Sequence, residues 1–202
     1  AKPVKNNKHR DGNRHAYNDY YITFDIETST LTKFQSHIFE DHEQAIMYLW
    51  SVYTPFGWCI GRTWAEVQQF FTTLNKYTLD NKIICFVHNL SYEFQFMIPY
   101  FQFSEVMALE SRQPFRATLL ENIELRCSQK LTNMSLEMAG DTFKVEHPKM
   151  AEAIDYTEVH TPSEVLDPIQ YEYNKIDTLC LYEVIEGVLR TYGPTIQSLP
   201  LT

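Results

Sequence analysis

The chain has 202 residues, with 26 acidic and 17 basic side chains and a formal net charge of −9 at pH 7. Its length favours one domain, and hydrophobic residues at 44% are enough for a sizeable core. The acidic balance argues against a protein that coats nucleic acid through phosphate contacts, because such proteins are basic. It does not exclude an enzyme that holds cations on carboxylates, because bound metal ions reverse the local charge.

The four cysteines show no zinc-like spacing and most lie in apolar runs, which indicates buried free thiols in a reducing compartment. The sequence contains no apolar run of about 18 residues that would cross a membrane. It also lacks the apolar core of a signal peptide at its start. We therefore expect a cytoplasmic protein with no membrane partner.

The first 19 residues are polar and partly basic, so we expect a flexible basic arm over 1–19 and one domain over 20–202. Short β-rich runs predict strands at 20–26, 45–54, 58–63, 82–87, 104–109, 116–120 and 123–127. Helices are predicted at 64–77, from about Ser91, from a cap at Thr132 or Asn133 through Ala139, and from Asp167 or Pro168 to Leu189. This order predicts a mixed α/β fold with helices on both faces of a sheet.

Two carboxylates lie at the end of the first predicted strand, in Asp25-Ile26-Glu27. Residues two apart in a strand share a face, so both side chains can point at one spot. Two acids there would repel each other without a cation between them, and oxygen ligands suit magnesium or manganese rather than zinc. So short a motif also recurs by chance at solvated strand ends, and alone it is weak evidence.

The last predicted helix carries Tyr173 and Asp177, which are four residues apart and therefore share a helical face. Asp177 lies in an otherwise apolar stretch from Ile176 to Leu181, where an acid is costly unless it is paired or metal-bound. A salt bridge and a metal ligand explain this residue equally well.

A third polar group gathers where the predicted strand 82–87 meets the next helix, and it consists of His88, Asn89 and Glu93. Strand ends and helix N-termini are the places where α/β folds bind ligands. Asn89 as a turn residue and His88 as a satisfied core histidine are the structural alternatives.

The three patterns are D-x-E, H-N-x-x-[YF]-[DE] and Y-x-x-x-D, and in this order they resemble the exonuclease motifs of the DEDD superfamily. The tyrosine four residues before the last aspartate resembles the DEDDy branch. The segments FDIETS, FVHNLSYEF and YNKID are similar to those of the proofreading domain of protein-primed, phage-type family B DNA polymerases. The resemblance covers roughly residues 20–202, which is nearly the whole chain.

This resemblance implies a ribonuclease H-like mixed sheet flanked by helices, and a 3′-5′ exonuclease that hydrolyses the ends of single-stranded DNA. It implies two divalent ions, Mg²⁺ or Mn²⁺, about 4 Å apart. Asp25 would bridge both ions. Glu27 and Asp177 would hold the ion that generates hydroxide, and Glu93 would hold the other. Tyr173 would orient the attacking water.

Two further signals resemble that group of polymerases: Ser135-Leu136 before a short helix, and Lys149 before an apolar-Asp-Tyr step. Lys149 would meet a phosphate. The nucleotide-binding residues implied by the resemblance are Thr28, His88, Asn89, Tyr92, Ser135 and Leu136. Ser135 as a helix cap, Leu136 as a core residue and Lys149 as a surface lysine are the structural alternatives.

The final segment, YGPTIQSLPLT, resembles the point where such polymerases pass from the exonuclease domain to the polymerase domain. We therefore expect a domain excised from a longer polymerase, or a stand-alone relative. The implied partners are a single-stranded DNA 3′ end, a polymerase domain in the same chain and a terminal priming protein. A phage-infected or plasmid-bearing host cell is the implied setting.

One position departs from the family pattern, because the second motif usually ends in aspartate and this chain has Glu93. The longer side chain leaves open a catalytically impaired exonuclease fold that binds single strands or a partner protein. An RNA-directed exonuclease on the same scaffold also stays open, as does a zinc protein that uses His37 and His42. The spacing of those two histidines matches no hydrolase motif.

Overall fold

A computed structural model describes residues 17–31, 44–78, 81–150, 158–193, 195–196 and 199–201. The strands are β1 (Tyr17–Leu31), β2 (Gln44–Thr54), β3 (Gly57–Gly61), β4 (Lys82–Val87), β5 (Phe103–Ala108), β6 (Pro114–Leu119) and β7 (Ile123–Cys127). The helices are α1 (Trp64–Tyr77), α2 (Leu90–Met97), α3 (Ser128–Thr132), α4 (Leu136–Phe143) and α5 (Pro168–Tyr192). All the described strands form one sheet in the order β3-β2-β1-β4-β7-β6-β5.

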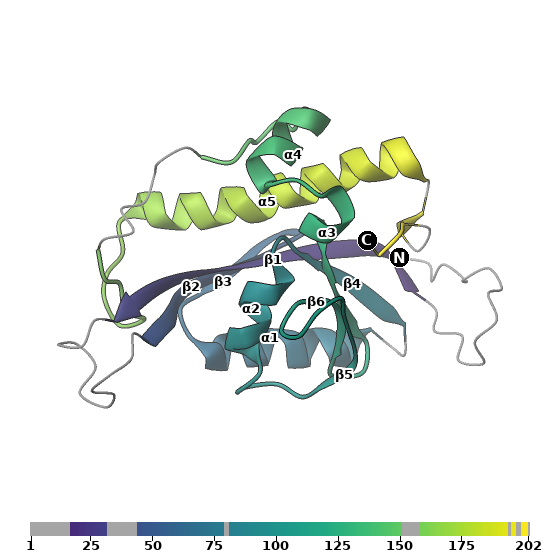
Figure 1. The fold of residues 1–202 in the computed structure, drawn as a ribbon. Coiled ribbons are helices and arrows are strands. Elements are labelled where there is room, and N and C mark those ends of the chain that lie inside the picture. Colours follow the sequence, from purple (N-terminus) through teal and green to yellow (C-terminus); the bar gives the residue numbers. More distant parts are fainter. Residues whose placement is uncertain are drawn as a thin grey trace.

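The strand β1 runs through the middle of this sheet (Figure 1). It pairs antiparallel with β2 and parallel with β4, and β4 in turn pairs parallel with β7. The other neighbouring strands are antiparallel. The mixed sheet expected of a ribonuclease H-like α/β fold is therefore confirmed.

Helices cover both faces of the sheet (Figure 1). Side chains alternate along β1, so neighbouring residues of this strand contact opposite helical layers. Ile22, Phe24 and Ile26 belong to a hydrophobic cluster that includes residues of α1 and α2. Tyr21 belongs to a second cluster on the opposite face, formed with residues of α4 and α5. The odd-numbered positions in this part of β1 therefore face α5.

The long helix α5 begins where the sequence predicts. Asp167 is its N-cap and shares a capping box with Gln170, and Pro168 occupies the first helical position. Both features satisfy or remove backbone N–H groups that the first turn leaves unpaired. The helix continues to Tyr192, three residues beyond the predicted end at Leu189.

A seam of buried polar contacts joins α5 to β1 and β2. The hydroxyl of Thr23 donates to the carbonyl of Thr178 at 2.7 Å, and that of Ser51 donates to the carbonyl of Asn174 at 3.1 Å. The hydroxyls of Ser51 and Thr178 also lie 3.1 Å apart. All four residues are fully buried, at 0% exposure. Because hydrogen bonds depend on distance and direction, these contacts fix the position of α5 along its own axis.

The start of β1 differs from the prediction, since the strand begins at Tyr17 rather than at residue 20. Tyr17 pairs with Lys82 of β4 and donates a hydrogen bond from its hydroxyl to Glu124 at 2.8 Å. These tertiary contacts extend the strand into the segment expected to be an arm. Residues 1–16, and the histidines His37 and His42, lie outside the described residues.

Two helix starts also differ. The helix predicted from about Ser91 begins at Leu90, and Asn89 is its N-cap. The helix predicted from a cap at Thr132 or Asn133 through Ala139 begins later, because Asn133 has a φ of 55° and ends a preceding helix, α3. Ser135 then caps α4, accepting from the backbone N–H of Met138 at 3.2 Å. No helix in the described part of the chain is long and apolar enough to cross a membrane.

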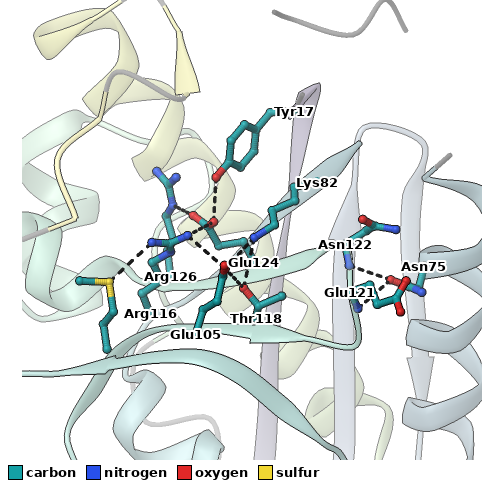
Figure 2. Close-up of polar contacts among 11 residues, drawn as sticks. Tyr17, Asn75, Lys82, Glu105, Arg116, Thr118, Glu121, Asn122, Glu124 and Arg126 are labelled. Carbon is teal, nitrogen blue, oxygen red and sulfur yellow. Dashed lines mark hydrogen bonds and ion pairs between the residues drawn. The ribbon is translucent and has the colours of Figure 1, made fainter. Parts of the chain in front are cut away.

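A buried charge network ties the outer strands to the start of β1 (Figure 2). Glu124 of β7, with 0% exposure, accepts from Tyr17 at 2.8 Å, from Arg116 at 2.8 Å and from Arg126 at 2.6 Å. Burial opposes ionisation of Glu124, but Arg126 and Arg116 outweigh it and lower the pKa of the carboxyl. The network therefore holds a charged glutamate inside the fold.

Candidate metal centre and active site

Asp25 and Glu27 lie on the side of β1 that faces α5, and they point the same way, as their spacing predicts. Asp25 is opposite Ser51 of β2, and Glu27 is opposite Leu49. The pairing register shifts by one residue directly after Glu27, where Thr28 lies opposite Met47 and Tyr48 of β2 is passed over.

The helix α5 brings a third carboxylate to this pair. Oxygens of Asp25, Glu27 and Asp177 lie within 4.8 Å of one another. Asp177 and Tyr173, one turn apart on α5, are both buried. The first and third sequence motifs therefore meet in one place, although about 150 positions separate them along the chain.

Asn174 joins this group, and the sequence analysis did not single it out. Its Nδ2 donates to Asp25 Oδ2 at 3.0 Å and lies 3.4 Å from Glu27 Oε1 as a second acceptor. The residue follows Tyr173 and precedes Asp177 by three positions, so it shares their helical face. That spacing was the available signal in the sequence.

Glu93 approaches from the first turn of α2. It is only 4% exposed, and its Oε2 is buried with no hydrogen-bond partner among the described residues. Burial raises the pKa of Glu93 to about 8; its own backbone N–H lowers it, and the nearby Glu27 adds to the rise. The second motif thus contributes a fourth acid close to the other three.

The four acids perturb one another strongly. Burial raises the pKa of Asp25 well above its usual value, and Glu27, Asp177 and Glu93 raise it further. Burial and then Asp177 raise the pKa of Glu27 to about 7. Burial also raises the pKa of Asp177, more than the neighbouring Lys149 lowers it. In the absence of cations, the cluster therefore retains protons near neutral pH.

Lys149, from the segment after α4, forms an ion pair with Asp177. Its Nζ also lies 4.8 Å from the centre of the Tyr173 ring. Burial lowers the pKa of Lys149, but Asp177 and Tyr173 outweigh it, so the pKa lies above its usual value. The lysine is thus a permanent positive charge at the edge of the acidic cluster.

Thr28 and Tyr92, both expected to bind nucleotides, contact each other directly. Their hydroxyl oxygens are 2.5 Å apart, which links β1 to α2 immediately beyond Glu27. Tyr92 is 41% exposed, so its ring is available to a ligand. The position suits an aromatic side chain that stacks on a base.

His88 and Asn89 lie at the junction of β4 and α2. His88 Nδ1 is 2.9 Å from the hydroxyl of Ser128, and burial followed by Lys149 lowers the pKa of the imidazole to about 4. The histidine is therefore neutral at physiological pH. Asn89 is exposed at the N-cap of α2, and its side chain makes no capping hydrogen bond.

Ser135 and Leu136 have structural roles in the described contacts. The hydroxyl of Ser135 caps α4, and Leu136 is 8% exposed in the cluster shared with α5. Both were expected to bind nucleotides, with a helix cap and a core residue as the structural explanations. Ser135 is therefore a helix cap and Leu136 a core residue, and a nucleotide contact for either residue stays a prediction.

An aromatic groove with a volume of about 730 Å³ adjoins Tyr92. Its walls come from α2, from β2, from the start of α1 and from Pro162, and they are formed by Ala45, Ile46, Met47, Trp64, Tyr92, Gln95, Phe96, Pro99, Tyr100 and Pro162. Trp64 and Tyr100 stack with ring centres 4.8 Å apart and planes 13° apart. Flat aromatic surfaces of this kind bind bases with little dependence on sequence.

The acidic cluster has the chemistry of a site for hard divalent cations. Its donors are carboxylate oxygens, which Mg²⁺ and Mn²⁺ prefer over zinc. Asp177 Oδ1 and Glu93 Oε2 are buried with no hydrogen-bond partner in the described part of the chain. Buried acceptors without partners are costly, and cations would satisfy both these oxygens and the accumulated negative charge.

Comparison with known proteins places the fold. No protein-family model matches the sequence, and no curated protein matches it. Among solved structures, Phi29 DNA polymerase complexed with primer-template DNA and incoming nucleotide is similar over 86% of this chain, with a TM-score of 0.66 and 15% identity. Phi29 DNA polymerase complexed with single-stranded DNA is similar over 88% of the chain, with a TM-score of 0.66 and 16% identity.

These matches cover 31% and 33% of the polymerase chain, so the present chain spans about a third of its length. The likeness confirms the predicted resemblance to a phage-type DNA polymerase at the level of the fold. At such low identity the likeness concerns the backbone architecture alone. The roles of individual side chains must be argued from the site itself.

Proposed function

We propose that this chain is a 3′-5′ exonuclease domain that hydrolyses the ends of single-stranded DNA and proofreads for a DNA polymerase. The proposal depends on the meeting of Asp25, Glu27 and Asp177 within 4.8 Å, with Glu93 buried beside them. The order of the three motifs and the fold shared with Phi29 DNA polymerase support it. A polymerase domain in the same chain and a terminal priming protein are the expected partners.

Asp25, Glu27, Glu93 and Asp177 would hold two divalent cations, Mg²⁺ or Mn²⁺. When bound, such ions generate a nucleophilic hydroxide and stabilise charge on the leaving 3′ oxygen. The raised pKa values of these carboxyls suit this role, because a cluster that is costly to ionise alone gains most from bound cations. Carboxylates that have given up their protons then become the ligands.

Tyr173 and Lys149 would act on the reacting groups. Tyr173 is buried one turn from Asp177, where its phenol can orient the water that attacks phosphorus. Lys149 is charged at every physiological pH and lies beside Tyr173. It would stabilise the non-bridging phosphate oxygens while the bond from phosphorus to the 3′ oxygen breaks.

The single strand would enter past α2. Thr28, Asn89 and Tyr92 would contact the terminal nucleotides, and the exposed ring of Tyr92 would stack on a base. The aromatic groove continues from Tyr92 toward Trp64 and gives the preceding bases further stacking surfaces. These contacts would tolerate any sequence, which a proofreading enzyme requires.

A cleavage assay tests the proposal. A single-stranded DNA labelled at its 5′ end should shorten stepwise in the presence of Mg²⁺ or Mn²⁺, and a chelator should stop the reaction. A phosphorothioate bond at the 3′ end should protect the substrate, because hydrolysis starts there. An RNA of the same sequence should be cut more slowly than the DNA. If the RNA is cut faster, RNA rather than DNA is the preferred substrate.

Variants assign the activity to the cluster. Asp25→Asn and Asp177→Asn should each lower the rate by roughly a thousandfold, since each removes a charged ligand. Glu186→Gln changes an exposed carboxylate on the same helix and should leave the rate unchanged. Full activity in either aspartate variant contradicts the assignment. If the unaltered protein binds single-stranded DNA but does not cut it, the result supports a catalytically impaired exonuclease fold instead.

A further inference from the structure

We propose that Asn174 is a positioning residue, whose amide holds the Asp25 and Glu27 carboxylates in the arrangement that binds divalent cations. This inference rests on the proposed function of the same site. Asn174 is fully buried, and its one nitrogen faces both acids, at 3.0 Å from Asp25 Oδ2 and 3.4 Å from Glu27 Oε1. An amide nitrogen carries two hydrogens, so it can donate to two acceptors at once.

The chemistry of the side chain suits this task. Two neighbouring carboxylates repel each other, and a neutral donor between them lowers the repulsion without adding a charge. A lysine in this place would compete with the cations, and an acid would increase the repulsion. The amide occupies one oxygen of Asp25 and one of Glu27 and leaves the other oxygen of each for metal ions.

The position of the amide is itself fixed by the fold. The backbone carbonyl of Asn174 accepts from Ser51 at 3.1 Å, and the seam around Thr178 holds the same turn of α5 on the sheet. Asp177 follows three residues later on the same face. The seam therefore sets where α5 lies, and the Asn174 side chain sets how the two strand carboxylates are oriented relative to Asp177.

A contribution to stability alone does not explain this residue. Asn174 Oδ1 is buried with no hydrogen-bond partner among the described residues. A buried acceptor without a partner destabilises the fold, and an apolar side chain of similar size would avoid this cost. The asparagine is therefore better explained by the site that it organises than by the packing of α5.

Metal binding without DNA tests the proposal. Asn174→Leu keeps the size of the side chain and removes its donors, and Mn²⁺ affinity measured by calorimetry should fall by about 10- to 100-fold. Exonuclease kcat should fall by a similar factor, while KM for single-stranded DNA stays within about twofold, because no strand contact is removed. The matched control is Thr178→Val, which removes only the Thr178 hydroxyl and keeps the two hydrogen bonds from Thr23 and Ser51 to backbone carbonyls that hold α5 on the sheet.

We expect Thr178→Val to lower the thermal midpoint but to keep Mn²⁺ affinity within about twofold of the unaltered protein. A loss below about tenfold in Asn174→Leu, or an equal loss in Thr178→Val, overturns the proposal. If Asn174→Leu does not fold, Asn174→Ala takes its place under the same criteria. If the unaltered protein binds Mn²⁺ but does not cut DNA, the proposed function is wrong. The positioning role of Asn174 is then still decided by the Mn²⁺ affinities of the variants.

Discussion

Lys149 is ion-paired with Asp177, so a carboxylate expected to hold a cation is already partly neutralised by the protein itself. The lysine is about one-third exposed and comes from the segment that follows α4, whereas Asp177 is buried on α5. A bound cation and the ammonium group would therefore compete for the negative charge of one carboxylate, in which Lys149 contacts Oδ2 and Oδ1 has no hydrogen-bond partner among the described residues. Cation binding would release the lysine toward the substrate phosphate.

This competition predicts opposite effects on binding and catalysis when the charge is removed. In Lys149→Met, Mn²⁺ affinity should rise by roughly three- to tenfold, because a partly exposed ion pair contributes about 1 kcal/mol. The exonuclease turnover should fall by at least about tenfold, because the phosphate loses its cationic partner. Calorimetry and a cleavage assay measure the two quantities. A parallel fall in both would assign the lysine to the structure of the site rather than to competition.

Shortening Glu93 should slow the enzyme. Glu93 is 4% exposed and lies in the first turn of α2. Glu93→Asp draws the carboxylate back toward α2 by one methylene and leaves a gap where the carboxylate was. We expect a fall in kcat of about 10- to 100-fold, since misplacement by about 1 Å can cost this much. Single-turnover cleavage rates measure the change. A higher rate in Glu93→Asp would show instead that the glutamate detunes the site.

Metal-free protein should lose stability as the pH rises. The pKa of Glu27 is about 7 and that of Glu93 about 8 in the fold, against an ordinary value of 4.5. The folded state therefore binds more protons than the unfolded state above pH 4.5, and the stabilisation is lost as the pH rises through 7 and 8. The loss should be on the order of a kcal/mol or more.

Urea unfolding in a chelator at pH 6 and pH 9 measures this effect. The midpoint should be lower at pH 9, and saturating Mn²⁺ should remove the difference by stabilising the ionised cluster. Glu93→Gln, which cannot titrate, should show a smaller difference between the two pH values. Equal midpoints for the metal-free unaltered protein at both pH values would contradict the raised pKa values.

The network around Glu124 should contribute to stability. Glu124→Ala leaves Arg116 and Arg126 without their shared buried acceptor, and we expect a loss of about 3–5 kcal/mol in the free energy of unfolding. Chemical denaturation measures the loss. Glu121→Ala, an exposed glutamate in the turn just before β7, is the matched control and should change stability by less than about 0.5 kcal/mol. Similar losses in both variants would argue against the network.

The aromatic groove should discriminate by substrate length. Trp64→Ala removes a stacking surface at a distance from the carboxylates, so it should weaken binding of longer single strands. The loss should be about 1–3 kcal/mol for strands that reach the groove, and negligible for dinucleotides. Fluorescence anisotropy over a series of lengths gives the comparison. An equal loss at every length would assign the effect to a general disturbance of the fold.

Local patterns in the sequence predicted most of the elements and the two faces of the sheet. The alternation around Asp25 and the helical spacing of Tyr173 and Asp177 each define a face, and the structure has these faces. The sequence failed where distant contacts decide the outcome. Tyr17 extends β1 only because Lys82 and Glu124 are there to pair with it. Similarly, the helix predicted to begin from a cap at Thr132 or Asn133 begins only after Ser135, because Asn133 ends the preceding helix instead.

The role of Asn174 shows the same limit within the site. From the sequence alone, Asn174 is one of many residues of α5, and nothing beside it in the sequence identifies its partners. Its partners, Asp25 and Glu27, are 149 and 147 positions away. Only the register of α5 on the sheet, set by Ser51 and its neighbours, brings the amide to the two acids.

That separation also governs when the site can exist during synthesis. The ribosome completes β1 before the other described elements of the domain, and the acids of this strand have no third carboxylate beside them until α5 has emerged. Contacts between such distant segments form late and slowly in folding. Under the proposed function, a growing chain therefore does not hydrolyse DNA until α5 has docked on the sheet. A product truncated before α5 would carry the two acids of β1 but no hydrolytic activity.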